Sequence, residues 1–136
     1  MKRKKYFLLL LFIPMVLFSS MLTTDAKSWS SSIKVSNLPT WGKVKDLKNY
    51  NTKTTTTQMA TFKATQISAL LPCFAHLRDS NGFIASEWGY LQKGTYNAKE
   101  NSAKKGVKYY VSVKTSDLEF GSGNSVTFRF SSDKMN

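Results

Sequence analysis

The chain has 136 residues, with 20 lysines and arginines against 8 aspartates and glutamates, which gives a formal net charge of +12. This length suits a single domain and leaves no room for two. Its one cysteine excludes a small domain held together by internal disulfide bonds.

The first 26 residues have the order of a secretory signal peptide. Basic residues 2–5 precede an unbroken apolar stretch at residues 6–18, and small and polar residues follow. This order directs a chain to export and ends in a cleavage site. Thr24 and Ala26 fit the small pockets of a signal peptidase, so we expect cleavage between Ala26 and Lys27.

The alternative for this segment is an uncleaved N-terminal membrane anchor. The apolar stretch at residues 6–18 is 13 residues long and contains Pro14. A membrane-spanning helix needs about 20 apolar residues, whereas about 10–14 suits a signal peptide. The expected localisation is therefore extracellular, with association with the cell wall as one form of it.

The charge that remains after cleavage predicts polyanionic partners. Removing four basic residues and Asp25 leaves 16 basic against 7 acidic residues, a net charge of +9. Outside a cell, this charge attracts anionic cell-wall polymers or a membrane surface. Nucleic acid is not expected, because lysine dominates and only Arg78 and Arg129 supply guanidinium groups. Solubility alone is the competing explanation for the lysines.

Residues 27–57 are expected to form a polar, partly irregular segment. Serine, asparagine and threonine dominate it, and the only strand predicted there lies near Ile33 and Val35. Trp29 and Trp41 argue against a free tail. These two indoles are expected to dock onto the domain or to meet a partner.

Residues 58–136 show the period-two alternation of half-buried strands. The clearest alternation lies in residues 59–67, 73–78, 107–113 and 126–130. Residues 79–82, Asp-Ser-Asn-Gly, predict a hairpin turn between residues 73–78 and a return strand at 83–91. The expected fold class is all-β, a small antiparallel sandwich or barrel of five to seven strands.

The inventory of reactive residues does not favour an enzyme. Cys73 and His76 lie three positions apart and therefore on opposite faces of one strand, which prevents a catalytic dyad. The acidic residues are expected in turns or beside lysines, and Glu87 is the one acid placed in a strand. Neither metal-ligand spacing nor a phosphate-binding glycine loop is present, so no metal or cofactor is expected. Cys73 is expected to be a buried apolar residue, with a Cys73-linked dimer as the alternative.

The remaining constellation combines aromatic and basic residues. Tyrosine and tryptophan are enriched at recognition sites. The predicted partner contacts are Trp88, Tyr90, Lys108, Tyr110 and Lys114. Core packing is the competing role for Trp88 and Tyr109, whereas Tyr110 shares its face with lysines and is expected to be exposed.

The C-terminal half of the chain resembles a broad group of small, poorly characterised secreted proteins of Gram-positive bacteria. The resemblance lies in residues 91–96, the tyrosine-bearing strand at 107–113 and the final aromatic strand before Ser-Ser-Asp at 131–133. Some members of the group are bacteriocin-like exports of the lactococcin type. The resemblance implies a secreted β-domain that binds the cell envelope or, alternatively, a bacteriocin-like toxin that acts on a competitor's envelope.

N-terminal sequencing of the exported protein tests the predicted cleavage. The chain recovered from the medium is expected to begin at Lys27. Recovery of a full-length chain from the membrane fraction alone would instead establish an uncleaved anchor.

Overall fold

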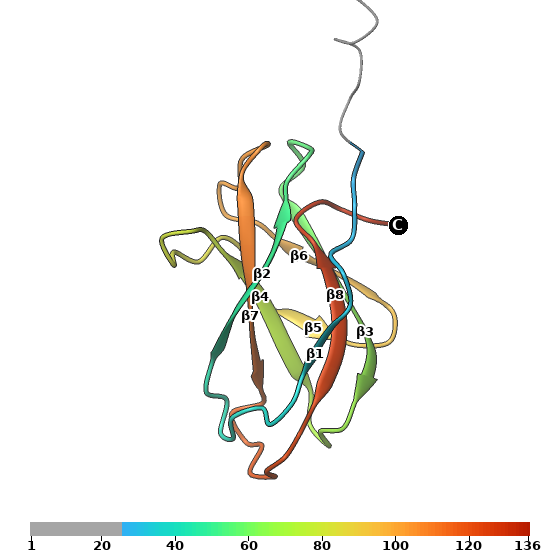
Figure 1. Cartoon of the computed structure of the whole chain (residues 1–136), viewed down its shortest axis with the longest axis vertical. Helices are drawn as coiled ribbons and strands as arrows, with labels where there is room; N and C mark the ends of the chain where they lie inside the picture. Colours follow the sequence, from blue (N-terminus) through green and yellow to red (C-terminus); the bar gives the residue numbers. More distant parts are fainter. Residues whose placement is uncertain (1–25) are drawn as a thin grey trace, which may run out of the picture.

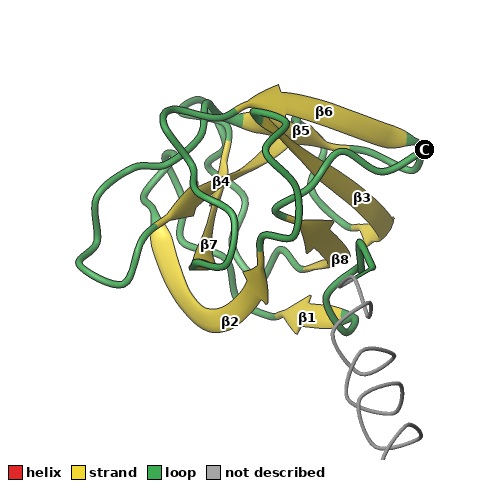
Figure 2. Ribbon diagram, turned by 90° about the horizontal axis from the view of Figure 1, so that it is seen from above, coloured by secondary structure: helices red, strands yellow, loops and turns green. Residues whose placement is uncertain are grey.

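The computed structural model describes residues 26–136, which form a sandwich of two four-stranded antiparallel sheets (Figures 1 and 2). The expected all-β sandwich is confirmed, with eight strands instead of five to seven. Of the predicted signal peptide, residues 1–25 lie outside the described residues, and Ala26 and Lys27 are both exposed. Within residues 26–136, no helix is long and apolar enough to span a membrane. The strands are β1 (Ile33–Val35), β2 (Lys45–Thr52), β3 (Met59–Ile67), β4 (Cys73–Arg78), β5 (Gly89–Leu91), β6 (Thr95–Lys99), β7 (Lys108–Thr115) and β8 (Val126–Ser131).

One sheet has the order β1-β8-β3-β6 and the other the order β2-β7-β4-β5. The N-terminal segment therefore supplies an edge strand to each sheet. Strand β1 lies at the predicted position near Ile33 and Val35, but β2 was not predicted. The sequence of β2 is KDLKNYNT, which has almost no apolar residues to alternate. Residues 45–52 form a strand because they pair with β7. Residues 27–57, which were expected to be a partly irregular segment, therefore belong to the same sandwich as residues 58–136.

The core lies between the sheets and consists of the inward residues of the predicted alternation. Strands β3, β4, β7 and β8 direct aliphatic and aromatic side chains inward, including the fully buried Phe62, Leu77 and Phe130. Phe62 stacks on Phe130 with 6.5 Å between ring centroids. Gly89 in β5 leaves room for this ring, because a Cβ at that position would lie 2.7 Å from the Phe62 side chain. Burial of these apolar side chains is the main favourable contribution to folding.

The predicted hairpin forms, but its return strand is shorter than expected. The Asp79 carboxylate accepts hydrogen bonds from the backbone N–H groups of Asn81 (2.9 Å) and Phe83 (3.0 Å), which builds the turn. After a single bridge between Arg78 and Ile84, the chain leaves β4 and bridges Ser86 to Glu100. Regular pairing with β4 resumes only at β5. Within the expected return strand at 83–91, alternation would place Ile84 on one face with Trp88 and Tyr90, but Ile84 lies exposed at the turn, apart from β5.

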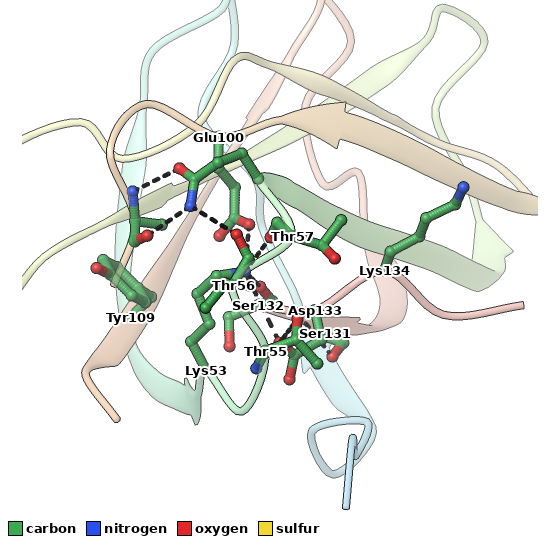
Figure 3. A network of polar contacts seen from close by, with 12 residues as sticks. Lys53, Thr55, Thr56, Thr57, Glu100, Tyr109, Ser131, Ser132, Asp133 and Lys134 are labelled. Atoms are coloured by element: carbon green, nitrogen blue, oxygen red, sulfur yellow. Dashed lines mark hydrogen bonds and ion pairs between the residues drawn. The ribbon is translucent and has the colours of Figure 1, made fainter. Parts of the chain in front are cut away.

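A fully buried lysine, Lys53, follows β2 directly (Figure 3). Its ammonium donates hydrogen bonds to the Glu100 carboxylate (2.6 Å) and to the backbone carbonyls of Thr57 (2.5 Å) and Ser132 (2.8 Å). All three N–H donors of the ammonium are thus satisfied by three different segments. Such pairing is required, because an unpaired buried charge is strongly destabilising.

Asp133 lies 3.7 Å from the same ammonium and holds the loop after β2. Its carboxylate accepts hydrogen bonds from the backbone N–H and hydroxyl groups of both Thr54 and Thr55, at 2.7–3.1 Å. Burial alone would raise the pKa of the Asp133 carboxyl, but these hydrogen bonds outweigh it and lower the pKa below its usual value. Most of the acids were expected to be turn-formers or solvated charges beside lysines, whereas Asp133 lies beside a lysine but is fully buried.

Glu100 also departs from that expectation, since it is buried and paired with Lys53. Burial raises the pKa of the Glu100 carboxyl to about 7, against the opposing effect of the Lys53 ammonium. Two buried carboxyls share a single ammonium here, and one of the two Glu100 oxygens has no hydrogen-bond partner. The Asp133 carboxylate accepts hydrogen bonds from Thr54 and Thr55, which stabilise its charged form. Glu100 has fewer such donors, so Glu100 is the carboxyl that takes up a proton.

Replacing Lys53 with methionine is expected to lower the free energy of unfolding by about 3–5 kcal/mol, because Glu100 and Asp133 then lose their buried counter-charge. Urea unfolding followed by circular dichroism measures the change. The control K63M removes a lysine on the outer side of β3 and should change the free energy by no more than about 0.5 kcal/mol. The variant E100Q keeps a hydrogen-bond acceptor for Lys53 and should remain folded if K53M does not. Equal stability of K53M and K63M would show that the buried lysine is dispensable.

Candidate binding face

The outer faces of the two sheets differ in composition. The outer face of β1-β8-β3-β6 carries threonines and cations such as Lys34, Lys63 and Arg129. The outer face of β2-β7-β4-β5 carries aromatic rings between cations. We name this second surface the aromatic face; it consists of Tyr50, Phe74, His76, Arg78, Trp88, Tyr90, Lys108, Tyr110, Ser112 and Lys114. All five residues predicted to contact a partner lie on it.

Strand pairing builds one half of the aromatic face around Tyr110. Tyr50 of β2 and Arg78 of β4 both pair with Tyr110 of β7, so the three side chains lie in a row. The rings of Tyr50 and Tyr110 are 5.8 Å apart. The Arg78 guanidinium lies 5.4 Å over the Tyr110 ring, and the Lys108 ammonium lies 4.6 Å over the Tyr50 ring. Both distances are within the range of cation–π attraction.

The other half of the face is arranged around Lys114. The Lys114 ammonium lies 4.6 Å from the centre of the Trp88 ring and 5.7 Å from that of Phe74. Phe74 in turn lies 5.0 Å from Tyr90, with which it pairs across β4 and β5. A hollow of about 450 Å³ opens beside these rings. It is lined by Phe74, Trp88, Lys114, Ser116, Asp117 and Leu118.

His76 lies on the outer side of β4 but is buried beneath Trp88, although its place opposite Cys73 predicts that it faces solvent or a crevice. The two rings stack with centroids 3.7 Å apart and planes at 13°, so the indole covers the imidazole. Burial lowers the pKa of His76 to about 4, and the Asp46 carboxylate opposes this effect while Lys114 and Arg78 add to it. The imidazole is therefore neutral near pH 7 and holds the indole in place by stacking. This arrangement gives Trp88 a partly buried position at the centre of the face.

Polar contacts at the β2 bulge fix the position of Arg78. The guanidinium donates a hydrogen bond to the Leu47 carbonyl (2.7 Å) and lies 3.6 Å from the Asp46 carboxylate. The Ser112 hydroxyl donates to the same carboxylate at 2.6 Å. Arg78 is therefore held beside Tyr110 by groups from two strands, which reduces the entropy that a ligand would have to remove on binding.

A second groove runs beside the edge of the aromatic face. It measures about 600 Å³ and lies between the N-terminal segment and β2, with Trp29, Lys48, Asn49 and Tyr50 among its lining residues. The Asn51 side-chain amide donates a hydrogen bond to the Ser28 carbonyl (3.1 Å) across this junction. Tyr50 lines the groove and also belongs to the aromatic face. Sequence reasoning missed Tyr50, since only the pairing of β2 with β7 places it beside Tyr110.

The groups considered for catalysis are dispersed. Cys73 is buried in the core while His76 lies on the outer side of β4, as the alternation predicted. Burial, with a smaller effect of Glu119, raises the pKa of the Cys73 thiol to about 11. Glu87 is exposed and lies outside any strand, contrary to expectation. Among residues 26–136, no three histidine, cysteine or acidic side chains come together in a way that could hold a metal ion.

Burial of Cys73 also bears on the alternative of a Cys73-linked dimer. The residue has no exposed surface, and a thiol of raised pKa is a poor nucleophile at neutral pH. A disulfide to a second chain would require the core to open. The folded structure therefore works against this alternative.

A scan of protein-family models and a search of curated proteins find no match to this chain.

The variant H76F tests the neutral, stacked state of His76. Below pH 6.5 the unfolded chain protonates His76 while the folded chain does so only near pH 4, so this group makes stability rise with pH across that window. The pKa of Glu100 is about 7 in the folded chain, compared with an ordinary value of 4.5. The folded chain therefore holds this proton more tightly, and Glu100 makes stability fall as pH rises from 4.5 to 7. The two slopes oppose each other in the unmodified protein, and each is at most about 1.4 kcal/mol per pH unit. In H76F a ring still stacks on Trp88, and stability is expected to fall as pH rises from 4.5 to 7.

Urea unfolding at half-unit pH steps measures these slopes. The matched variant E100Q should show the opposite slope, a rise in stability between pH 4 and pH 6.5, because it removes the raised pKa of Glu100 and keeps the lowered pKa of His76. Identical pH profiles for H76F and the unmodified protein would contradict the assignment.

Proposed function

We propose that this protein is an exported, non-enzymatic module that binds anionic glycopolymers of the cell envelope through the aromatic face. The observation that carries the proposal is the alternation of rings and cations on one sheet. Lys108, Arg78 and Lys114 each lie within 4.6–5.4 Å of the centre of an aromatic ring. Such a surface offers apolar faces and positive charges at a regular spacing.

The chemistry of this surface fits an acidic sugar polymer. The C–H faces of sugar rings are apolar and pack on aromatic rings, while phosphate or carboxylate groups form charge-assisted hydrogen bonds with lysine and arginine. Tyr50 and Tyr90 are 49% and 45% exposed, so their rings are accessible to such a ligand. The hollow beside Phe74 and Trp88 adds polar groups from Ser116 and Asp117, which suit sugar hydroxyls.

The comparison with the opposite sheet argues against charge for solubility alone. Solubility requires only dispersed charge, as on the outer face of β1-β8-β3-β6. Among residues 26–136, Lys34 and Lys63 of that sheet lie over no ring, and Arg129 lies 4.5 Å from the centre of the Trp29 ring. The aromatic face exposes several rings at once, which a soluble domain does not need. Clustered exposed rings of this kind are typical of recognition surfaces.

A pull-down on purified cell walls tests the proposal with charge-matched variants. K108Q/K114Q removes two charges from the aromatic face, and K34Q/K63Q removes two from the opposite sheet. K108Q/K114Q is expected to weaken binding by about tenfold or more, since the loss of two charge-assisted contacts exceeds 1.4 kcal/mol. K34Q/K63Q should retain most of the binding.

Two further measurements complete this test. Walls stripped of their anionic polymers should bind the unmodified protein weakly, and Y50A/Y110A, which keeps the full charge, should also lose binding. Equal losses for the two lysine pairs would show that diffuse charge, and not the aromatic face, attracts the protein to the wall.

A further inference from the structure

Three loops at one end of the sandwich expose apolar side chains. They are residues 36–44 between β1 and β2, residues 68–72 between β3 and β4, and residues 116–125 between β7 and β8, and they lie together at the lower end of Figure 1. We name this end the apolar loop end. Its most exposed apolar side chains are Trp41 (59%), Val44 (50%), Leu70 (97%), Leu118 (72%) and Phe120 (75%).

Glu119 holds these loops in one arrangement. Its side chain is buried, and its carboxylate accepts hydrogen bonds from the backbone N–H groups of Leu71 (3.2 Å) and Gly121 (3.0 Å). The Glu119 carbonyl accepts a third hydrogen bond, from the Trp41 N–H at 2.7 Å. One residue thus joins all three loops. The exposed apolar side chains are therefore presented by a fixed framework.

The backbone at Trp41 lies in a tight turn, in which the Lys43 N–H donates a hydrogen bond to the Thr40 carbonyl (3.3 Å). Trp41 has a φ of 60°, in the left-handed region that bulky residues rarely adopt. Its neighbour Gly42 packs directly on the loop after β7, where a Cβ would lie 2.1 Å from the Asp117 carboxylate. The result is an indole that projects from the surface beside Phe120, with ring centroids 6.2 Å apart. The turn therefore presents an exposed pair of aromatic rings at the apolar loop end.

Basic residues surround these apolar tips. Lys43 and Lys45 follow Trp41, and Lys93 lines a hollow of about 440 Å³ together with Leu70 and Leu71. Of the two acids in these loops, Glu119 is buried, whereas the Asp117 side chain is 79% exposed and is balanced by a nearby lysine. Asp117 lies 3.7 Å from the Lys114 ammonium. The apolar loop end therefore combines uncovered hydrocarbon with a positive rim.

We propose that the apolar loop end inserts shallowly into an anionic lipid bilayer. Tryptophan favours the membrane interface, leucine and phenylalanine favour the acyl region, and lysines are attracted to anionic headgroups. A glycan would leave the aliphatic tips of Leu70 and Leu118 uncovered, and a second copy of this chain would bring two positive rims together. A bilayer satisfies both the apolar tips and the charge around them. The apolar loop end adjoins the aromatic face at the hollow that Leu118 lines, but the side chains tested below lie outside that hollow, and this proposal does not depend on the proposed function.

Sedimentation with lipid vesicles tests the proposal. Residues 27–136 contain both sheets in full and are mixed with vesicles of phosphatidylcholine, with or without phosphatidylglycerol, and no wall polymer. Binding is expected to require phosphatidylglycerol and to weaken as salt is added. L70S/F120S should weaken binding by about tenfold or more, since two large side chains lose their burial. The control F83S/I84S removes two exposed apolar side chains from the turn after β4, away from this end, and should bind as the unmodified protein does.

Fluorescence and hydrodynamic measurements sharpen the outcome. Vesicles should shift the tryptophan emission to the blue, and W41F should lose most of that shift. K108Q/K114Q should lose no more vesicle binding than K34Q/K63Q, so failure of wall binding and failure of membrane binding remain distinguishable. The proposal is overturned if the unmodified protein does not bind the vesicles, if L70S/F120S and F83S/I84S behave alike, or if L70S/F120S instead abolishes a dimer seen by sedimentation velocity.

Discussion

The buried ammonium of Lys53 is the interaction on which the rest of this structure depends. It joins the end of β2 to Glu100 after β6 and to Ser132 after β8, positions that are 47 and 79 residues away in the sequence. A buried charge cannot be left without partners, so the three segments must arrive together for the sandwich to close. Asp133 adds the loop after β2 to the same junction. In a domain without disulfides, this polar junction connects segments that apolar packing alone would leave loosely tied.

The aromatic face is a consequence of that junction. Strand β2 has little apolar surface of its own, and its position at the edge of the sheet depends on β7 and on the Lys53 cluster that follows it. Once β2 is in place, Tyr50 meets Tyr110 and the bulge at Asp46 holds Arg78. A stability element inside the protein and a candidate binding surface outside it thus share one strand. Loss of the Lys53 cluster is therefore expected to disturb the aromatic face as well.

The apolar loop end and the aromatic face could contact their proposed partners at the same time. The strands run along the length of the sandwich, with the apolar loop end at one extremity and the aromatic face along one side (Figures 1 and 2). Under the two proposals, a molecule docked on a bilayer by its loops presents the aromatic face sideways to polymers that rise from the membrane. The positive charge serves both contacts, because each partner is anionic. Under both proposals, the cationic domain would lie at the boundary of membrane and wall.

The sequence by itself determined the features that depend on local alternation. Period-two patterns located β3, β4, β7 and β8, placed Cys73 in the core, and separated it from His76 across the strand. The combination of aromatic and basic residues selected five predicted partner contacts, and these lie on one face of the sandwich. The strand positions and the burial of Cys73 share a reason: a side chain's face within one strand follows from its position in that strand.

Only the tertiary structure decided the features that depend on distant partners. Lys53, Glu100 and Asp133 look like ordinary surface charges in the sequence, and their burial follows from segments that meet across the fold. His76 is buried because Trp88, from outside the strand, covers it, and β2 exists because β7 pairs with it. The apolar loop end escaped prediction for the same reason, since its side chains come from three loops that Glu119 joins. Burial of charge and clustering of loops are properties of the closed sandwich, and no local pattern encodes them.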